Sequence, residues 1–133
     1  YRQVNETGQM KLFRSHRDDY QDGHQTRDFV YVDDVCDVCM YMMHHRLKVK
    51  SGLYNLGSGN GRTFLDLVKA TFYAMGREPN IVFIDTPQDI RDTYQYFTEA
   101  DLSKLRKTGY TSEFTKLEDG IEDYVKNYLD KLK

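Results

Sequence analysis

A short stretch, Thr26 to Val35, narrows the choice of fold because it holds a strand signal and a helix start in direct succession. The run Phe29–Val32 is aromatic and β-branched, which is typical of a strand. Asp33 and Asp34 follow, and they predict a helix start because their side-chain oxygens can accept hydrogen bonds from the first free amides. Arg27 stands at the entrance of this strand, where its forked guanidinium suits the phosphate oxygens of an anionic ligand.

Size and composition favour one soluble globular domain, because the chain has 133 residues, of which 39% are hydrophobic and 30% charged. A formal net charge of -2 argues against a general nucleic-acid or membrane-surface binder. No apolar run approaches the roughly 18 residues of a membrane helix. No signal peptide is visible and the first residue is Tyr1, so we expect the chain to be a piece of a longer protein.

Two cysteines, Cys36 and Cys39, have the C-x-x-C spacing of some redox and zinc sites. Neither a βαβ start nor a second ligand pair accompanies them, so we interpret both as small apolar residues on the buried face of the predicted helix. With no disulfide framework, we expect a cytoplasmic protein.

The remaining signals predict an α/β fold with a small sheet of about four strands and flanking helices. Residues 1–8 are polar and expected to be irregular, and the predicted strands are Gln9–Phe13, Phe29–Val32, Leu53–Leu56 and Ile81–Ile84. Thr63 with Asp66 resembles a capping box for a helix that ends at Gly76, and Thr115 with Glu118 resembles one for the last helix.

Two segments invite a ligand interpretation. The loop from Arg14 to Thr26 carries His and Asp residues, but their spacing fits no standard metal site, and we expect a solvated loop without a metal. The run Gly57, Gly59, Gly61 resembles a dinucleotide fingerprint with the wrong spacing, so we favour a tight turn into the following helix.

Three motifs together resemble the extended short-chain dehydrogenase/reductases that act on nucleotide sugars. The segment RDFVYVDDV at 27–35 resembles the stretch that leads into their substrate domain, and YNLGSG at 54–59 resembles their second hallmark. More narrowly, YQYFTEAD at 94–101 and LRKTGY at 105–110 resemble the branch that acts on an ADP-linked heptose. The resemblance covers roughly residues 9–130.

This resemblance implies a parent enzyme that interconverts two epimers of an ADP-heptose for lipopolysaccharide core synthesis, by transient oxidation with NADP. Members bind NADP on the Gly-rich first turn of an N-terminal Rossmann domain and use a Tyr-x-x-x-Lys pair. This sequence contains neither that turn nor that pair. We therefore expect residues 1–133 to be a single C-terminal nucleotide-sugar-binding domain, inactive alone, whose partners are that Rossmann domain and further copies in a homo-oligomer. Alternatives are an epimerase or dehydratase of another nucleotide sugar, or a non-catalytic binding or interaction domain.

The resemblance also implies which residues bind the substrate. Arg27 matches the family arginine that reaches the diphosphate, and Tyr94 matches a tyrosine that hydrogen-bonds the same ligand. The residues that match the loop bordering the substrate nucleotide are Phe13, Arg14, Ser15 and His16. No residue of this chain is expected to bind the cofactor or a metal ion.

Overall fold

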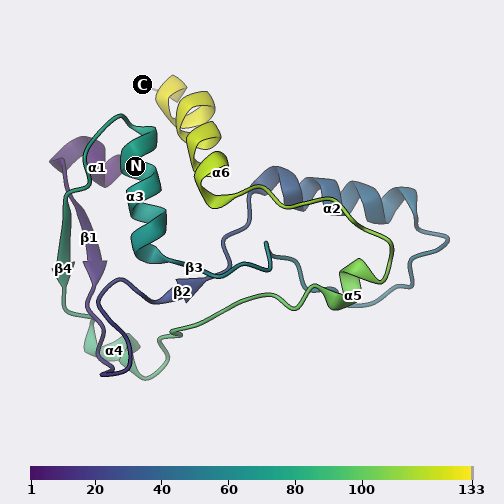
Figure 1. The fold of residues 1–133 in the computed structure, drawn as a ribbon, viewed down its shortest axis with the longest axis horizontal. Coiled ribbons are helices and arrows are strands. Elements are labelled where there is room, and N and C mark those ends of the chain that lie inside the picture. Colours follow the sequence, from purple (N-terminus) through teal and green to yellow (C-terminus); the bar gives the residue numbers. More distant parts are fainter. Residues whose placement is uncertain (133) are drawn as a thin grey trace.

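Two parallel strands and the helices packed against them form one lobe of the computed structural model, which describes residues 1–132. Strand β1 (Met10–Phe13) pairs with β4 (Ile81–Ile84), as Figure 1 shows. Helices α1 (Arg2–Thr7) and α3 (Phe64–Ala74) complete this lobe. Its core consists of three buried residues, with partly buried side chains around them: Val4, Val68 and Phe72, then Met10, Leu12, Met75 and Ile81.

A second lobe is built around α2 (Val32–His44), which extends away from the strand pair, with α5 (Ser103–Arg106) below it in Figure 1. Its buried residues are Val38, Leu105 and Tyr110. The molecule therefore has two separate hydrophobic clusters rather than one.

A short antiparallel pair lies between the two lobes (Figure 1). Strand β2 (Thr26–Arg27) pairs with β3 (Arg62–Thr63) in the register Thr26 to Thr63. On its other side, the Thr26 amide donates to the carbonyl of Tyr96 at 2.8 Å, and the Thr98 amide donates to the carbonyl of Thr26 at 3.2 Å. Residue 26 is thus bracketed by two segments that are remote in the sequence.

Helix α3 begins as predicted. The Asp66 amide donates to the Thr63 hydroxyl at 3.0 Å, and the Thr63 amide donates to the Asp66 carboxylate at 3.1 Å, so the capping box is confirmed. Gly76 follows the helix with φ of 65°, a left-handed conformation that glycine adopts without strain.

The rest of the chain adds short helices. Helix α4 (Gln88–Arg91) follows β4. Helix α6 (Leu117–Tyr124) packs against α3 and continues as a π-helical turn, Val125–Leu129, and a 3₁₀ turn, Asp130–Leu132. None of the helices in residues 1–132 has the length and apolar character needed to cross a membrane.

Two predicted strands are wrong. Phe29–Val32 forms no strand: Phe29, Val30 and Tyr31 line an apolar cavity beside α3 and α6, and Val32 already belongs to α2. Leu53–Leu56 is also irregular, and Leu53 is 92% exposed. Neither segment has a strand partner within residues 1–132, and β-propensity without a paired neighbour does not produce a strand. Sequence reasoning also missed β2 and β3.

Helix starts provide further corrections. Asp33 and Asp34 do not cap α2; the N-cap is Tyr31, and both carboxylates lie in the first turn, where they favour the positive end of the helix dipole. Thr115 caps no helix, because its amide and hydroxyl both donate to Asp34, each at 2.9 Å. Residues 1–8 are not irregular but contain α1, which is anchored by the fully buried Val4.

The predicted burial of the two cysteines is wrong as well. Cys36 and Cys39 are free and exposed, and Met43 on the same helix is 63% exposed. Val38 is the apolar residue of α2 that is buried.

Candidate functional site

Arg27 is held in place without a carboxylate partner among the described residues. Its guanidinium donates to the backbone carbonyl of Thr26 at 2.8 Å and to that of Gln95. The guanidinium carbon lies 5.6 Å from the ring centroid of Phe64 and 5.7 Å from that of Tyr94. Neutral carbonyls and aromatic rings position the cation but leave its charge uncompensated, which suits an anionic ligand.

A cavity of about 350 Å³ lies beside the two rings that contact Arg27, which is not itself a lining residue. The same two rings that contact the guanidinium, Phe64 and Tyr94, form part of its wall, and the full lining is Lys11, Leu12, Phe13, Gln25, Phe64 and Tyr94. Its volume lies near the lower end of the range for small-molecule sites, about 300–1,000 Å³. Aromatic walls beside an unpaired cation can accept a flat ring at one end of a ligand and an anion at the other.

Tyr94 belongs to both the cavity wall and the surroundings of Arg27. Its ring meets Phe13 edge to face at a centroid distance of 6.1 Å, and it meets Tyr96 at 5.7 Å. Burial raises the pKa of the Tyr94 phenol, the Arg27 guanidinium opposes this rise, and Tyr96 adds to it. The net effect raises the pKa, so the phenol is protonated at neutral pH and can donate a hydrogen bond. Within residues 1–132 that hydroxyl has no hydrogen-bond partner.

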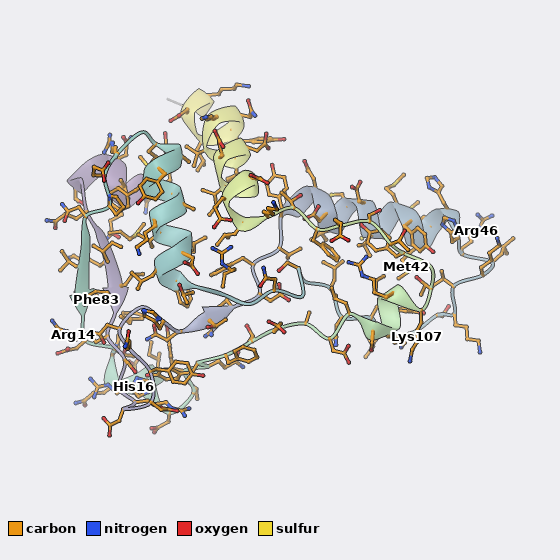
Figure 2. The ribbon with its side chains drawn as sticks, viewed as in Figure 1. Arg14, His16, Met42, Arg46, Phe83 and Lys107 are labelled. Carbon is orange, nitrogen blue, oxygen red and sulfur yellow. The ribbon has the colours of Figure 1, made fainter. Side chains whose placement is uncertain are left out.

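The predicted loop residues divide into two groups. Phe13 lines the cavity, whereas the side chains of Arg14, Ser15 and His16 hold the loop together and are not part of the cavity wall. Arg14 pairs with Asp85 at 3.2 Å, and Figure 2 shows it with His16 at the end of β1.

His16 is held on both ring nitrogens. Nδ1 contacts the Tyr96 hydroxyl at 3.0 Å, and Nε2 contacts the carbonyl of Arg91 at 3.1 Å. The same hydroxyl also accepts the His16 amide at 2.9 Å and the Ser15 hydroxyl at 3.3 Å. These bonds place the loop beside the cavity, so Ser15 and His16 contribute to the site through position.

Asp28, the residue after Arg27, joins three segments of the chain. Its carboxylate accepts hydrogen bonds from the Ser58 amide and hydroxyl, both at 2.6 Å, from the Gly59 amide at 3.0 Å and from the Ala100 amide at 2.9 Å. Burial alone raises the pKa of this carboxyl, but the hydrogen bonds outweigh it and hold that pKa below its usual value. Gly57 permits this approach, because a Cβ there would lie 2.4 Å from Asp28 Oδ2.

The glycine run does not fit a dinucleotide. The amides of Ser58 and Gly59 are used by Asp28, the Asn60 amide donates to the Ser58 hydroxyl at 3.2 Å, and the Gly61 amide donates to Glu99 at 2.8 Å. No amide of this run from Ser58 to Gly61 remains for a pyrophosphate, which favours the interpretation of the glycines as a tight turn. Within residues 1–132, no three His, Cys, Asp or Glu side chains are grouped so that they could hold a metal ion.

Sequence reasoning missed four members of the cavity wall: Lys11, Leu12, Gln25 and Phe64. A signal for Gln25 was available, because residues two apart in an extended chain share a face, and Gln25 stands two before Arg27. Nothing in the local sequence indicates that the Phe64 ring faces a cavity.

Comparison with known proteins shows which family this chain resembles. The family model described as "NAD dependent epimerase/dehydratase family" matches residues 2–57. An ADP-L-glycero-D-manno-heptose-6-epimerase of Fusobacterium nucleatum is 47% identical over 98% of this chain and 41% of its own length. The enzyme of the same name from Nitratidesulfovibrio vulgaris is 47% identical over 97% of this chain and 39% of its own. The chain therefore spans well under half of these relatives.

Solved structures give the same picture. The Helicobacter pylori ADP-L-glycero-D-manno-heptose-6-epimerase matches with a TM-score of 0.71 and 27% identity, over 94% of this chain and 34% of that one. A UDP-glucose-4-epimerase from Stenotrophomonas maltophila with bound NAD has a TM-score of 0.76 at 23% identity, over 98% of this chain and 39% of that one, and thus shares the fold. In sequence and in fold, the chain therefore resembles the NAD dependent epimerase/dehydratase family, and proteins named ADP-L-glycero-D-manno-heptose-6-epimerase match nearly its whole length.

Proposed function

We propose that this chain is the nucleotide-sugar-binding part of a larger, NADP-dependent epimerase. The whole enzyme would interconvert ADP-D-glycero-D-manno-heptose and ADP-L-glycero-D-manno-heptose for lipopolysaccharide core synthesis in the cytoplasm. The names and 47% identity of two relatives support this assignment. The observation that carries it is the guanidinium of Arg27, which has no acidic partner among the described residues and contacts two aromatic rings of a cavity wall.

In this proposal the nucleotide base occupies the cavity and the diphosphate meets Arg27. The guanidinium can bind phosphate oxygens bidentately, and the protonated phenol of Tyr94 can donate to the same ligand. Binding of the nucleotide end then positions the distant sugar carbon, and remote binding energy of this kind supports catalysis at the reacting centre.

Catalysis belongs to a part of the enzyme outside residues 1–133. The nicotinamide cofactor supplies hydride transfer when bound. The residues described here do not fit that cofactor. The Ser58 and Gly59 amides of the glycine run already donate to Asp28, and the Tyr-x-x-x-Lys pair is absent from the sequence. We further propose an N-terminal Rossmann domain as the holder of NADP, a homo-oligomeric enzyme, and an inactive chain when these residues stand alone.

The test uses the full-length protein and isothermal titration of ADP, UDP and dTDP in competition, together with proton NMR of ADP-heptose incubated with the enzyme. Preferential ADP binding and interchange of the two heptose epimers are expected. Preference for a pyrimidine nucleotide would assign the protein to another nucleotide sugar. Failure to bind any of the three would leave a domain without a nucleotide-sugar function and contradict the proposal.

A further inference from the structure

Gln25 is the unusual member of the cavity wall. Its side chain is 1% exposed, yet its Nε2 has no hydrogen-bond partner, and it is the one buried side-chain nitrogen or oxygen in this state among the described residues. Buried polar groups in native proteins nearly always have a partner, so an unsatisfied amide at the wall of a cavity indicates that a ligand supplies one.

The backbone fixes the place of this amide. The carbonyl of Gln25 accepts the Phe64 amide at 3.1 Å, and the next residue donates its amide to the Tyr96 carbonyl at 2.8 Å. Gln25 is therefore tied on one side to the start of α3 and, through Thr26, to the segment that carries Tyr94. These two ties hold it against the cavity, whose wall includes the Phe64 and Tyr94 rings that contact Arg27.

The other groups on the wall define the ligand. Phe13, Phe64 and Tyr94 offer aromatic surface for a planar ring, and a carboxamide offers one donor and one acceptor side by side. Adenine presents the complementary edge, an amine beside a ring nitrogen, and Gln pairs with it bidentately. An apolar side chain of the same size would fill the space without forming hydrogen bonds to that edge.

We propose that Gln25 is a specificity-determining residue that hydrogen-bonds the edge of the nucleotide's adenine, its Nε2 donating to a ring nitrogen. This inference rests on the proposed function, since it places the base of an ADP-sugar in the cavity. It assigns the two ends of the nucleotide to different residues: Gln25 reads the base, and Arg27 binds the diphosphate.

The test compares Gln25→Met with wild type in the full-length protein, with ADP and base-free inorganic pyrophosphate as the two ligands. Because the carboxamide contacts only the base, we expect ADP affinity to fall about tenfold or more while pyrophosphate affinity stays within twofold. Because methionine removes an unsatisfied buried donor, the thermal midpoint without nucleotide should be unchanged or higher.

Three results would overturn this assignment: an unchanged ADP affinity, an equal loss of ADP and pyrophosphate affinity, or a lowered thermal midpoint, which would indicate a structural role. Arg27→Ala distinguishes the two proposals, since it should weaken both ligands. If Arg27→Ala weakens ADP and Gln25→Met does not, only the role of Gln25 fails. If neither variant alters ADP binding, the proposed nucleotide site itself fails.

Discussion

The guanidinium of Arg27 lies 5.7 Å from the ring centroid of Tyr94, although the two residues are far apart in the sequence. The backbone explains this proximity, because β2 is bracketed by β3 on one side and by the segment around Tyr96 on the other. A cation and a phenol donor are thus brought to the same cavity by main-chain hydrogen bonds, and side-chain substitutions can test each without dismantling the framework.

The first prediction concerns Arg27. Replacing it with alanine removes a charge-assisted, bidentate hydrogen-bond donor, so ADP-sugar binding to the full-length protein should weaken by about 1.5–3 kcal/mol. Isothermal titration calorimetry measures the change. Arg46→Ala is the matched control, because that exposed arginine lies past the end of α2 in the other lobe (Figure 2). Equal affinities for wild type and Arg27→Ala would remove Arg27 from the site.

Tyr94→Phe tests the phenol separately from the ring. The aromatic wall and the contact with Arg27 remain, while a protonated donor is lost, so we expect a smaller loss of ADP-sugar affinity, about 0.5–1.5 kcal/mol. Tyr73→Phe, at a tyrosine that is 61% exposed on α3, is the control and should leave affinity unchanged. A loss as large as that of Arg27→Ala would show that the hydroxyl does more than donate one neutral hydrogen bond.

Asp28→Asn should destabilise the fold. The carboxylate accepts four hydrogen bonds from the Ser58 amide and hydroxyl, the Gly59 amide and the Ala100 amide, and asparagine replaces one acceptor oxygen with a donor. We expect the free energy of unfolding to fall by about 2–3 kcal/mol, measured by urea denaturation of the full-length protein. Asp37→Asn, at an exposed position of α2, controls for the loss of a charge.

The same carboxyl predicts a pH dependence. Its pKa is lower in the folded than in the unfolded chain, so its stabilising contribution is complete above the unfolded value of about 3.9 and is lost as the pH falls through the lower folded value. Denaturation midpoints of wild type and Asp28→Asn should therefore converge below about pH 4. A gap between the two that persists in acid would mean that the ionised carboxylate is not the cause.

Thr63→Ala should remove the N-cap of α3. Loss of the hydroxyl leaves the Asp66 amide without its acceptor, which typically costs about 1 kcal/mol of stability. Urea denaturation measures the change, and Thr111→Ala, at an exposed loop position, is the control. A Thr63→Ala protein as stable as the control would show that the hydrogen bond from the Asp66 amide to the Thr63 hydroxyl contributes nothing measurable.

The sequence predicts those elements whose signals are local. Strands β1 and β4 and the capping box of α3 follow from short patterns, and the structure confirms them. Phe29–Val32 and Leu53–Leu56 have equally strong strand composition but form no strand, because pairing depends on a neighbour and composition describes only the segment itself.

The candidate site, like the fold, could be predicted only in part. The proximity of Arg27 and Tyr94 was expected from the family resemblance, and the structure brings them together; their roles toward a ligand stay predictions. The Asp28 network could not be predicted, because it depends on partners that are distant in the sequence. That the Asp28 carboxylate accepts four hydrogen bonds can be known only once Ser58, Gly59 and Ala100 are placed around it.

The pairing of β2 with β3 has one more consequence. Each strand has two residues, and Arg27 is opposite Arg62 in the ladder. Successive side chains of an extended strand alternate between faces, so a slip of one position would turn Arg27 to the reverse side and present the carboxylate of Asp28 in its stead. A phosphate beside the Phe64 and Tyr94 rings would then meet a carboxylate, so the register of these two short strands sets the sign of the charge that a ligand meets.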